Sequence, residues 1–189
     1  MENPLVSLAS INPRIILDIR YATENNFLGR KVYSKPQAYL RKSTAQKLDR
    51  AQQVLEKKGL GLKVWDAYRP EPVQRELWNF MPDERYVAHP DKGSVHSRGG
   101  AVDVTLVDAQ GHELEMPTGF DEFSQRAFLN YPDLSDAIRA HRELLCSVMV
   151  DAGFDALETE WWHYADRESA RFPLESISFE ELERLQSLF

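Results

Sequence analysis

A histidine and an aspartate frame a glycine turn in the stretch Ser94-Val-His96-Ser-Arg-Gly-Gly-Ala-Val-Asp103. The two glycines let the chain reverse, because glycine adopts positive φ without steric cost. A catalytic zinc usually takes three protein ligands from His, Asp or Glu and keeps a fourth position for water. The stretch therefore offers two candidate ligands, although the same residue types also surround turns that hold no metal.

A third candidate ligand is His163, in the stretch Glu160-Trp-Trp-His163. Glu160 could then be the general base that deprotonates a metal-bound water. Residues three apart on a regular strand point to opposite faces, so this pair requires a turn or a bulge between them. The alternative is a pair of core tryptophans beside a surface glutamate. A set of two histidines and one aspartate also suits ferrous iron.

An arginine follows a predicted strand in Asp66-Ala-Tyr-Arg69-Pro70. Pro70 restricts the backbone of Arg69 to extended conformations. An arginine at a strand end usually forms a surface ion pair. Beside a metal, it would instead bind the oxyanion of a tetrahedral intermediate.

Hydrophobic periodicity predicts the elements that must position these residues. Strands are expected at 14–21, 62–67 and 101–107. One helix is expected to begin at a cap formed by Ser43 or Thr44 and to stop at Gly59, and three more are expected at 71–80, 134–152 and 178–189. A long irregular segment, 22–42, is expected to fold over a pocket, and 82–93 is expected to be a polar connection. No repeat or linker divides the chain, so one α+β domain over residues 1–189 is predicted.

The predicted strand at 101–107 alternates in a way that bears on the site. Ala101, Asp103, Thr105 and Val107 fall on one face, and the valines and leucine between them fall on the other. Asp103 should therefore point away from the more apolar face.

Composition excludes several classes of protein. The chain has 189 residues, a hydrophobic fraction of 42% and a net charge of −7 with dispersed lysines and arginines, which argues against a nucleic-acid partner. Its one cysteine, Cys146, cannot form an internal disulfide and lies in an apolar helical pattern. No apolar run reaches the roughly 20 residues of a membrane span, and the first residues do not form a signal peptide. We expect a cytoplasmic protein without a membrane partner.

The stretches around His96, Arg69 and His163 together resemble the zinc D-alanyl-D-alanine dipeptidases, both the vancomycin-resistance type and its housekeeping relatives. A wider group of zinc D-Ala-D-Ala peptidases, with hedgehog-like domains, shares the signature Ser-x-His-x-x-Gly-x-Ala-x-Asp followed by Glu-x-x-His, and both parts are present without a gap. The dipeptidase branch adds Asp-x-Arg-Tyr-Ala-Thr at 18–23, Asp-Ala-Tyr-Arg-Pro at 66–70 and Met-Pro-Thr-Gly-Phe-Asp at 116–121. The resemblance covers about residues 14–165.

The resemblance implies a central, mostly antiparallel sheet flanked by helices on one side, with one zinc ion per chain. It implies that Glu160 first accepts a proton and later gives it to the leaving amine. Arg69 would stabilise the oxyanion. The remaining implied roles are zinc ligation by His96, Asp103 and His163, contact with the substrate ammonium by Tyr21 and Asp121, and proximity to the substrate carboxylate for Ser94.

The activity implied is hydrolysis of the free dipeptide D-Ala-D-Ala to two D-alanines. A site that pairs both charged ends of a dipeptide would reject longer peptides, because a buried carboxylate such as Asp121 needs its cation. The alternatives are a D,D-carboxypeptidase or murein endopeptidase of the same group, and a zinc-binding module without catalytic activity. The sequence leaves the oligomeric state open.

Overall fold

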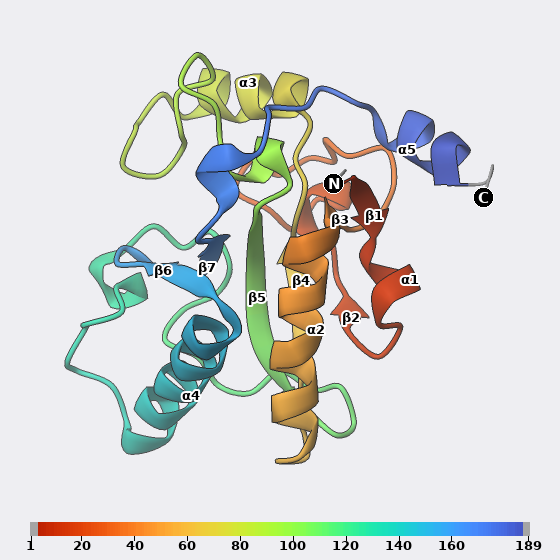
Figure 1. Ribbon diagram of the computed structural model, residues 1–189. Helices are drawn as coiled ribbons and strands as arrows, with labels where there is room; N and C mark the ends of the chain where they lie inside the picture. The colour runs from red at the N-terminus through yellow and green to blue at the C-terminus, as the bar shows by residue number, and fades with distance from the viewer. Residues whose placement is uncertain (1–3, 187–189) are drawn as a thin grey trace.

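The computed structural model describes residues 4–186 and is built around a five-stranded sheet in the order β2-β4-β5-β7-β6, shown in Figure 1. A separate two-stranded sheet pairs β1 with β3. The strands are β1 (Leu5–Ser7), β2 (Ile16–Leu17), β3 (Tyr39–Arg41), β4 (Leu60–Asp66), β5 (Ala101–Asp108), β6 (Phe154–Leu157) and β7 (Glu160–Asp166). The α-helices are α1 (Leu8–Ile11), α2 (Lys42–Glu56), α3 (Glu71–Phe80), α4 (Asp136–Ala152) and α5 (Phe179–Gln186).

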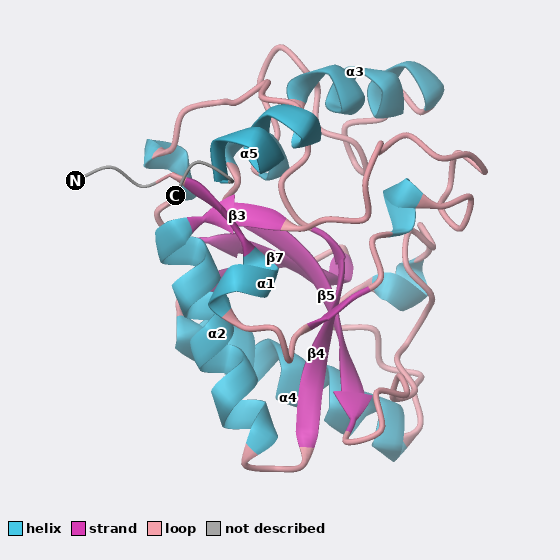
Figure 2. Cartoon of the chain, turned by 90° about the vertical axis from the view of Figure 1, so that its right-hand side faces the viewer, coloured by secondary structure: helices cyan, strands magenta, loops and turns pink. Residues whose placement is uncertain are grey.

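The large sheet is antiparallel except where β2 pairs with β4, which agrees with the mostly antiparallel sheet that the resemblance implies. Helices α2 and α4 pack on each other and on one face of it, as Figures 1 and 2 show from two directions. Fully buried apolar residues of β5 face these helices: Val102, Val104 and Leu106. The opposite face is covered by loops and short 3₁₀ turns (Figure 2). The predicted α+β class is confirmed.

The three internal helices form close to their predicted positions. Helix α4 begins after Ser135, whose Oγ accepts a hydrogen bond from the Ile138 N–H at 3.3 Å, and it ends at Gly153 with φ 107°. The predicted cap of α2 is wrong, because the helix begins at Lys42. Thr44 Oγ1 instead donates to the buried Asp166 Oδ2 at 2.8 Å and so ties α2 to β7.

Of the strand predicted at 14–21, only Ile16–Leu17 is a strand, and the chain then enters a 3₁₀ turn at Arg20–Ala22. The polar residues of this motif bond locally and stabilise the turn. Arg20 Nε donates to Asp18 Oδ2 at 2.8 Å, and Thr23 Oγ1 donates to the Arg20 carbonyl at 2.9 Å. The turn buries Tyr21.

Short elements near the N-terminus are not predicted from the hydrophobic pattern. Strand β3 lies inside the segment predicted to be irregular and pairs with β1, and three residues are too few to show a period. At the other end, α5 confirms a terminal helix, but residues 187–189 of that prediction lie outside the described residues. None of the helices within residues 4–186 is long and apolar enough to cross a membrane.

Candidate active site

Three side chains that could hold a metal converge where β5 meets β7. Asp103 Oδ1 lies 2.9 Å from His163 Nδ1, and His96 Nε2 lies 3.2 Å from His163 Nδ1 and 3.5 Å from Asp103 Oδ2. Ligands about 2.1 Å from a tetrahedral zinc are about 3.4 Å from one another. The two nitrogens and the carboxylate therefore fit one zinc ion with little rearrangement.

Strand pairing positions two of these three residues. Asp103 and His163 are direct partners in the antiparallel β5–β7 ladder, so their side chains project from the same face. Tyr164 and Asp166 alternate with His163 along β7, and Asp166 bonds to Thr44 on α2. His163 and Asp103 thus point away from the helices, as the alternation of β5 predicts.

His96 comes from a 3₁₀ turn, His96–Arg98, just before β5. Its Nδ1 lies 2.7 Å from the Ala67 carbonyl oxygen, which fixes the ring so that Nε2 faces the other two ligands. Gly99 ends the turn with φ 67°, and a Cβ at this position would collide with Leu5. Positive φ and close packing both require glycine here, so the reversal attributed to the glycine turn is confirmed.

Glu160 reaches the same face through an irregularity in the β6–β7 hairpin. Tyr164 pairs with Ala156, but the next pair is Glu160 with Leu157, so residues 161–163 have no counterparts on β6. The bulge that the spacing of Glu160 and His163 requires is therefore confirmed. The intervening tryptophans are core residues, but Glu160 is not on the surface, since only 8% of it is exposed.

A second bulge, in β4, brings Asp66 opposite Asp103, one residue out of register with the Val64–Val104 pair. Asp66 is fully buried, and its Oδ2 accepts hydrogen bonds from Arg69 Nε at 3.1 Å and Nη2 at 2.7 Å. Arg69 is therefore not in a surface ion pair. A buried carboxylate is the partner that a buried guanidinium requires, so Asp66 could have been selected from its motif together with Arg69.

Gln74 of α3 is another residue that the sequence pattern does not single out. Its Oε1 accepts a hydrogen bond from Arg69 Nη1 at 2.8 Å. Its Nε2 donates to the Ala88 carbonyl at 2.7 Å. On periodicity alone it is one polar residue of a short helix.

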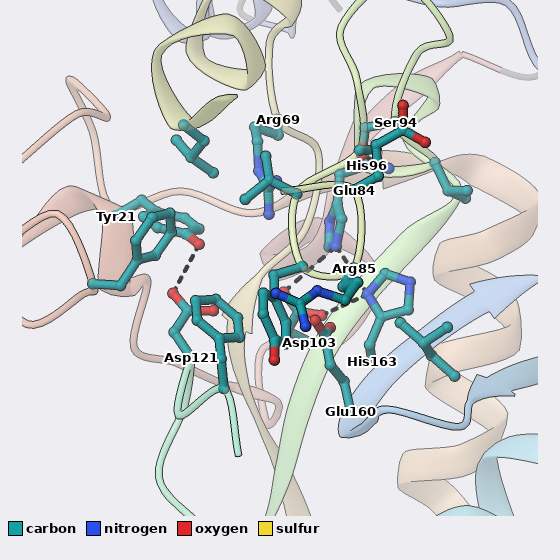
Figure 3. Close-up of a pocket in the computed structure, with 18 residues that line it drawn as sticks. Tyr21, Arg69, Glu84, Arg85, Ser94, His96, Asp103, Asp121, Glu160 and His163 are labelled. Atoms are coloured by element: carbon teal, nitrogen blue, oxygen red, sulfur yellow. Dashed lines mark hydrogen bonds and ion pairs between the residues drawn. The ribbon is translucent and has the colours of Figure 1, made fainter. Parts of the chain in front are cut away.

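Tyr21 and Asp121 meet on the side of the site away from His163 in Figure 3. The Tyr21 hydroxyl donates to Asp121 Oδ2 at 2.8 Å, and Asp121 has φ 57°, an uncommon value outside glycine. Trp161 Nε1 donates to Thr118 Oγ1 at 2.9 Å, which fixes the loop that carries Asp121. Ser94 Oγ accepts the His96 N–H at 3.2 Å.

All eight residues selected from the sequence line one cavity of about 280 Å³ (Figure 3). They are Tyr21, Arg69, Ser94, His96, Asp103, Asp121, Glu160 and His163. Residues 84–88 line it too, so part of the connection 82–93, which we call the wall segment, encloses the site. Phe27 from the predicted pocket-covering segment contributes, as do Phe123 and Leu157.

Burial and neighbouring charges control the ionisation of the carboxyl groups here. It raises the pKa of Glu160 to about 8, against the opposing effect of His163, and negative charge on Asp103 and Asp121 adds to the increase. Burial, with Asp103, also raises the pKa of Asp121 to about 8. For Asp103, burial is outweighed by His96 and His163, which hold its pKa below the usual range. The cavity thus contains carboxyl groups whose pKa values are shifted in opposite directions, a property typical of catalytic sites.

The sequence profile of a family described as D-Ala-D-Ala dipeptidase matches residues 1–180. The chain belongs to this family. It is 37% identical to the D-alanyl-D-alanine dipeptidase of Escherichia coli over 93% of this chain and 91% of that protein. The proteins of the same name from Enterococcus faecium and Streptomyces coelicolor are 33% and 34% identical, over 89% and 80% of this chain and 94% and 85% of theirs.

Membership of the D-Ala-D-Ala dipeptidase family confirms the resemblance drawn from the motifs, and the protein is therefore a peptidase. The matched region contains every element that contributes to the cavity. The profile stops at residue 180, so most of helix α5 lies beyond the matched region.

Proposed function

We propose that the protein hydrolyses free D-Ala-D-Ala to two D-alanines at this cavity, with one zinc ion held by His96, Asp103 and His163. The observation that carries the proposal is the convergence of these three ligand atoms beside a buried glutamate. Zinc, when bound, supplies a water of lowered pKa and polarises the peptide carbonyl. The names of the relatives support the choice of dipeptide.

Glu160 is the general base in this mechanism. Its raised pKa makes it a strong proton acceptor once it is ionised, and a cation held by its neighbours would favour that ionised form. Glu160 accepts the proton of the attacking water and later donates it to the nitrogen of the leaving D-alanine. A carboxyl with a pKa near the working pH serves both steps.

Arg69 stabilises the charge that develops on the carbonyl oxygen. A guanidinium has five N–H donors, and Asp66 and Gln74 use three of those on Arg69. Asp66 and Gln74 leave one N–H on Nη1 and one on Nη2, and in this mechanism these bind the carbonyl oxygen. Because Asp66 and Gln74 fix the group beforehand, it needs little reorganisation during the reaction.

The substrate ammonium is recognised by Asp121, with Tyr21 orienting the carboxylate through its hydroxyl. Ser94 lies near the substrate carboxylate. An N-acylated peptide brings no cation to Asp121, which then stays protonated and offers the peptide no ion pair. Loss of this ion pair disfavours longer peptides and separates a dipeptidase from a D,D-carboxypeptidase or a murein endopeptidase.

The deciding experiment compares D-alanine release from D-Ala-D-Ala and from its N-acetyl derivative, with and without a chelator. We expect rapid hydrolysis of the free dipeptide, little of the blocked one, and loss of activity that added zinc restores. Equal turnover of the blocked peptide would identify a carboxypeptidase or endopeptidase instead. If metal analysis shows that a fully active preparation contains no zinc, the assignment of zinc is wrong and iron becomes the candidate metal. The cytoplasmic location stays a prediction.

A further inference from the structure

Gln74 connects two parts of the site that are separate in the chain. It is 1% exposed, and its side chain lies between the Arg69 guanidinium and the Ala88 carbonyl of the wall segment. Arg69 can only donate and a carbonyl can only accept, so the amide has one satisfactory orientation. Its oxygen must face Arg69 and its nitrogen must face Ala88.

We propose that Gln74 is a positioning residue that holds the oxyanion-binding arginine and the cavity wall in register with each other. This inference rests on the role of Arg69 in the proposed function. Asp66 fixes the Nε and Nη2 edge of the guanidinium, and Gln74 is the partner that fixes Nη1. The free N–H groups therefore keep their direction only while both partners are in place.

The same amide helps to attach the wall segment to α3. Two of the segment's ion pairs, between Asp83 and Arg85 and between Glu84 and Lys92, lie within the segment. A third joins the exposed side chains of Arg75 on α3 and Asp91 at 3.6 Å, and exposed pairs contribute little to stability. The bond from the buried Gln74 side chain to the Ala88 carbonyl also joins the segment to α3, at 2.7 Å. Displacement of the wall would consequently pull Gln74 away from Arg69.

A polar side chain other than glutamine cannot make both contacts. Glutamate would still accept from Arg69 Nη1, but its carboxylate would face the Ala88 carbonyl with no donor. Methionine has similar length and would remove both contacts. The cost falls mainly on Arg69, because its guanidinium is buried and would lose the partner of Nη1. The two substitutions thus separate the contact with Arg69 from the contact with the wall.

The kinetic test measures kcat and KM for D-Ala-D-Ala in Gln74→Met and Gln74→Glu. We expect Gln74→Met to lower kcat by about 10- to 100-fold, as loss of a buried hydrogen bond to a charged group implies. Gln74→Glu should keep kcat within a few-fold of the wild type and raise KM several-fold, because the wall loosens while Arg69 stays bonded.

Gln52 provides a matched control. It is also a buried helical glutamine, and its side chain accepts the Leu62 N–H at 2.8 Å and donates to Glu56 at 2.9 Å, with no part in the cavity. Gln52→Met should lower the melting temperature but leave kcat and KM within about twofold. An equal fall in kcat in both methionine variants would mean a general structural effect and would overturn the inference.

A double variant tests whether Gln74 acts through Arg69. In an Arg69→Met background, Gln74→Met should have little further effect on kcat. An undiminished effect there, or unchanged kinetics in Gln74→Met alone, would overturn the inference while leaving the proposed function intact. An Arg69→Met enzyme with wild-type activity would instead refute the role of Arg69. If Gln74→Met does not fold, Gln74→Glu decides: a fall in kcat without a rise in KM contradicts the proposed arrangement.

Discussion

The two faces of β5 are equally buried but differ in chemistry. Towards α2 and α4, the strand presents Val102, Val104 and Leu106, and all three are fully buried. On the other face, it presents Asp103, which lines the cavity, and Thr105, and these are 3% and 1% exposed. One strand therefore separates a packed apolar layer from a layer of buried polar groups.

The polar layer carries an energetic cost that the apolar layer does not. Buried charge is expensive unless it is paired or neutralised. Here Arg69 pairs with Asp66, while burial favours the protonated forms of Glu160 and Asp121. Substitutions on the helix side should thus reduce stability and spare activity. On the cavity side they should reduce activity and need not reduce stability.

Glu160→Gln is expected to have the largest effect on activity. Loss of the general base should lower kcat by about 10³-fold, within the range for such residues. Stability should be unchanged or higher, because the change removes a buried ionisable group. Release of D-alanine and a thermal melt measure the two quantities, and zinc content serves as the control. Full hydrolytic activity in this variant would show that the mechanism is wrong.

Arg69→Met should lower both activity and stability, because Arg69 serves the reaction and also pairs with the buried Asp66. Turnover should fall by about 10²-fold or more if Arg69 binds the oxyanion. Asp66 would remain buried without its partner, at a cost of about 3–5 kcal/mol. Adding Asp66→Asn should restore much of the stability and none of the activity, as denaturant titration and kinetics can show. Zinc binding should survive both changes, and its loss would indicate wider damage to the site.

Leu106→Ala tests the helix face of the same strand. Removing this fully buried side chain should destabilise the protein by about 2–5 kcal/mol. Because the contact is with the helix layer, kcat at a temperature well below the melting point should stay within about twofold. A large fall in kcat with zinc still bound would mean that the two layers are not independent.

The effect expected to be smallest, counted per pH unit, is the pH dependence of stability in the metal-free protein. Asp121 has a folded pKa of about 8 against an ordinary value of 3.8, so between these values the folded state holds a proton that the unfolded chain has lost. The contribution of Asp121 to stability is therefore fully present below about pH 4 and decreases as pH rises towards 8, by at most about 1.4 kcal/mol per pH unit.

Asp121→Asn is the control for this prediction. Thermal melts between pH 5 and 8 should show a flatter dependence in the variant than in the wild type. The remaining slope includes the contribution of Glu160, whose pKa is raised in the same direction. Identical slopes in the two proteins would contradict the assignment of a protonated Asp121.

The identities of the site residues were available from the sequence because the motifs are short and local. His96 and Asp103 lie on either side of one turn, and the alternation along β5 already separates Asp103 from the apolar face. The spacing of Glu160 and His163 required a bulge, and the β6–β7 register contains one. Helices α2, α3 and α4 were also found, because each is long enough to display a period.

The tertiary structure decided what no local pattern encodes. Periodicity gives no sign of the register shift in β4 that brings Asp66 opposite Asp103, because it depends on pairing between two strands. The placement of Gln74 between Arg69 and Ala88 depends on how α3 and the wall segment pack. The sequence by itself determined which residues can carry the chemistry. Only the fold determined which partners hold them, because those contacts join segments that are distant in the chain.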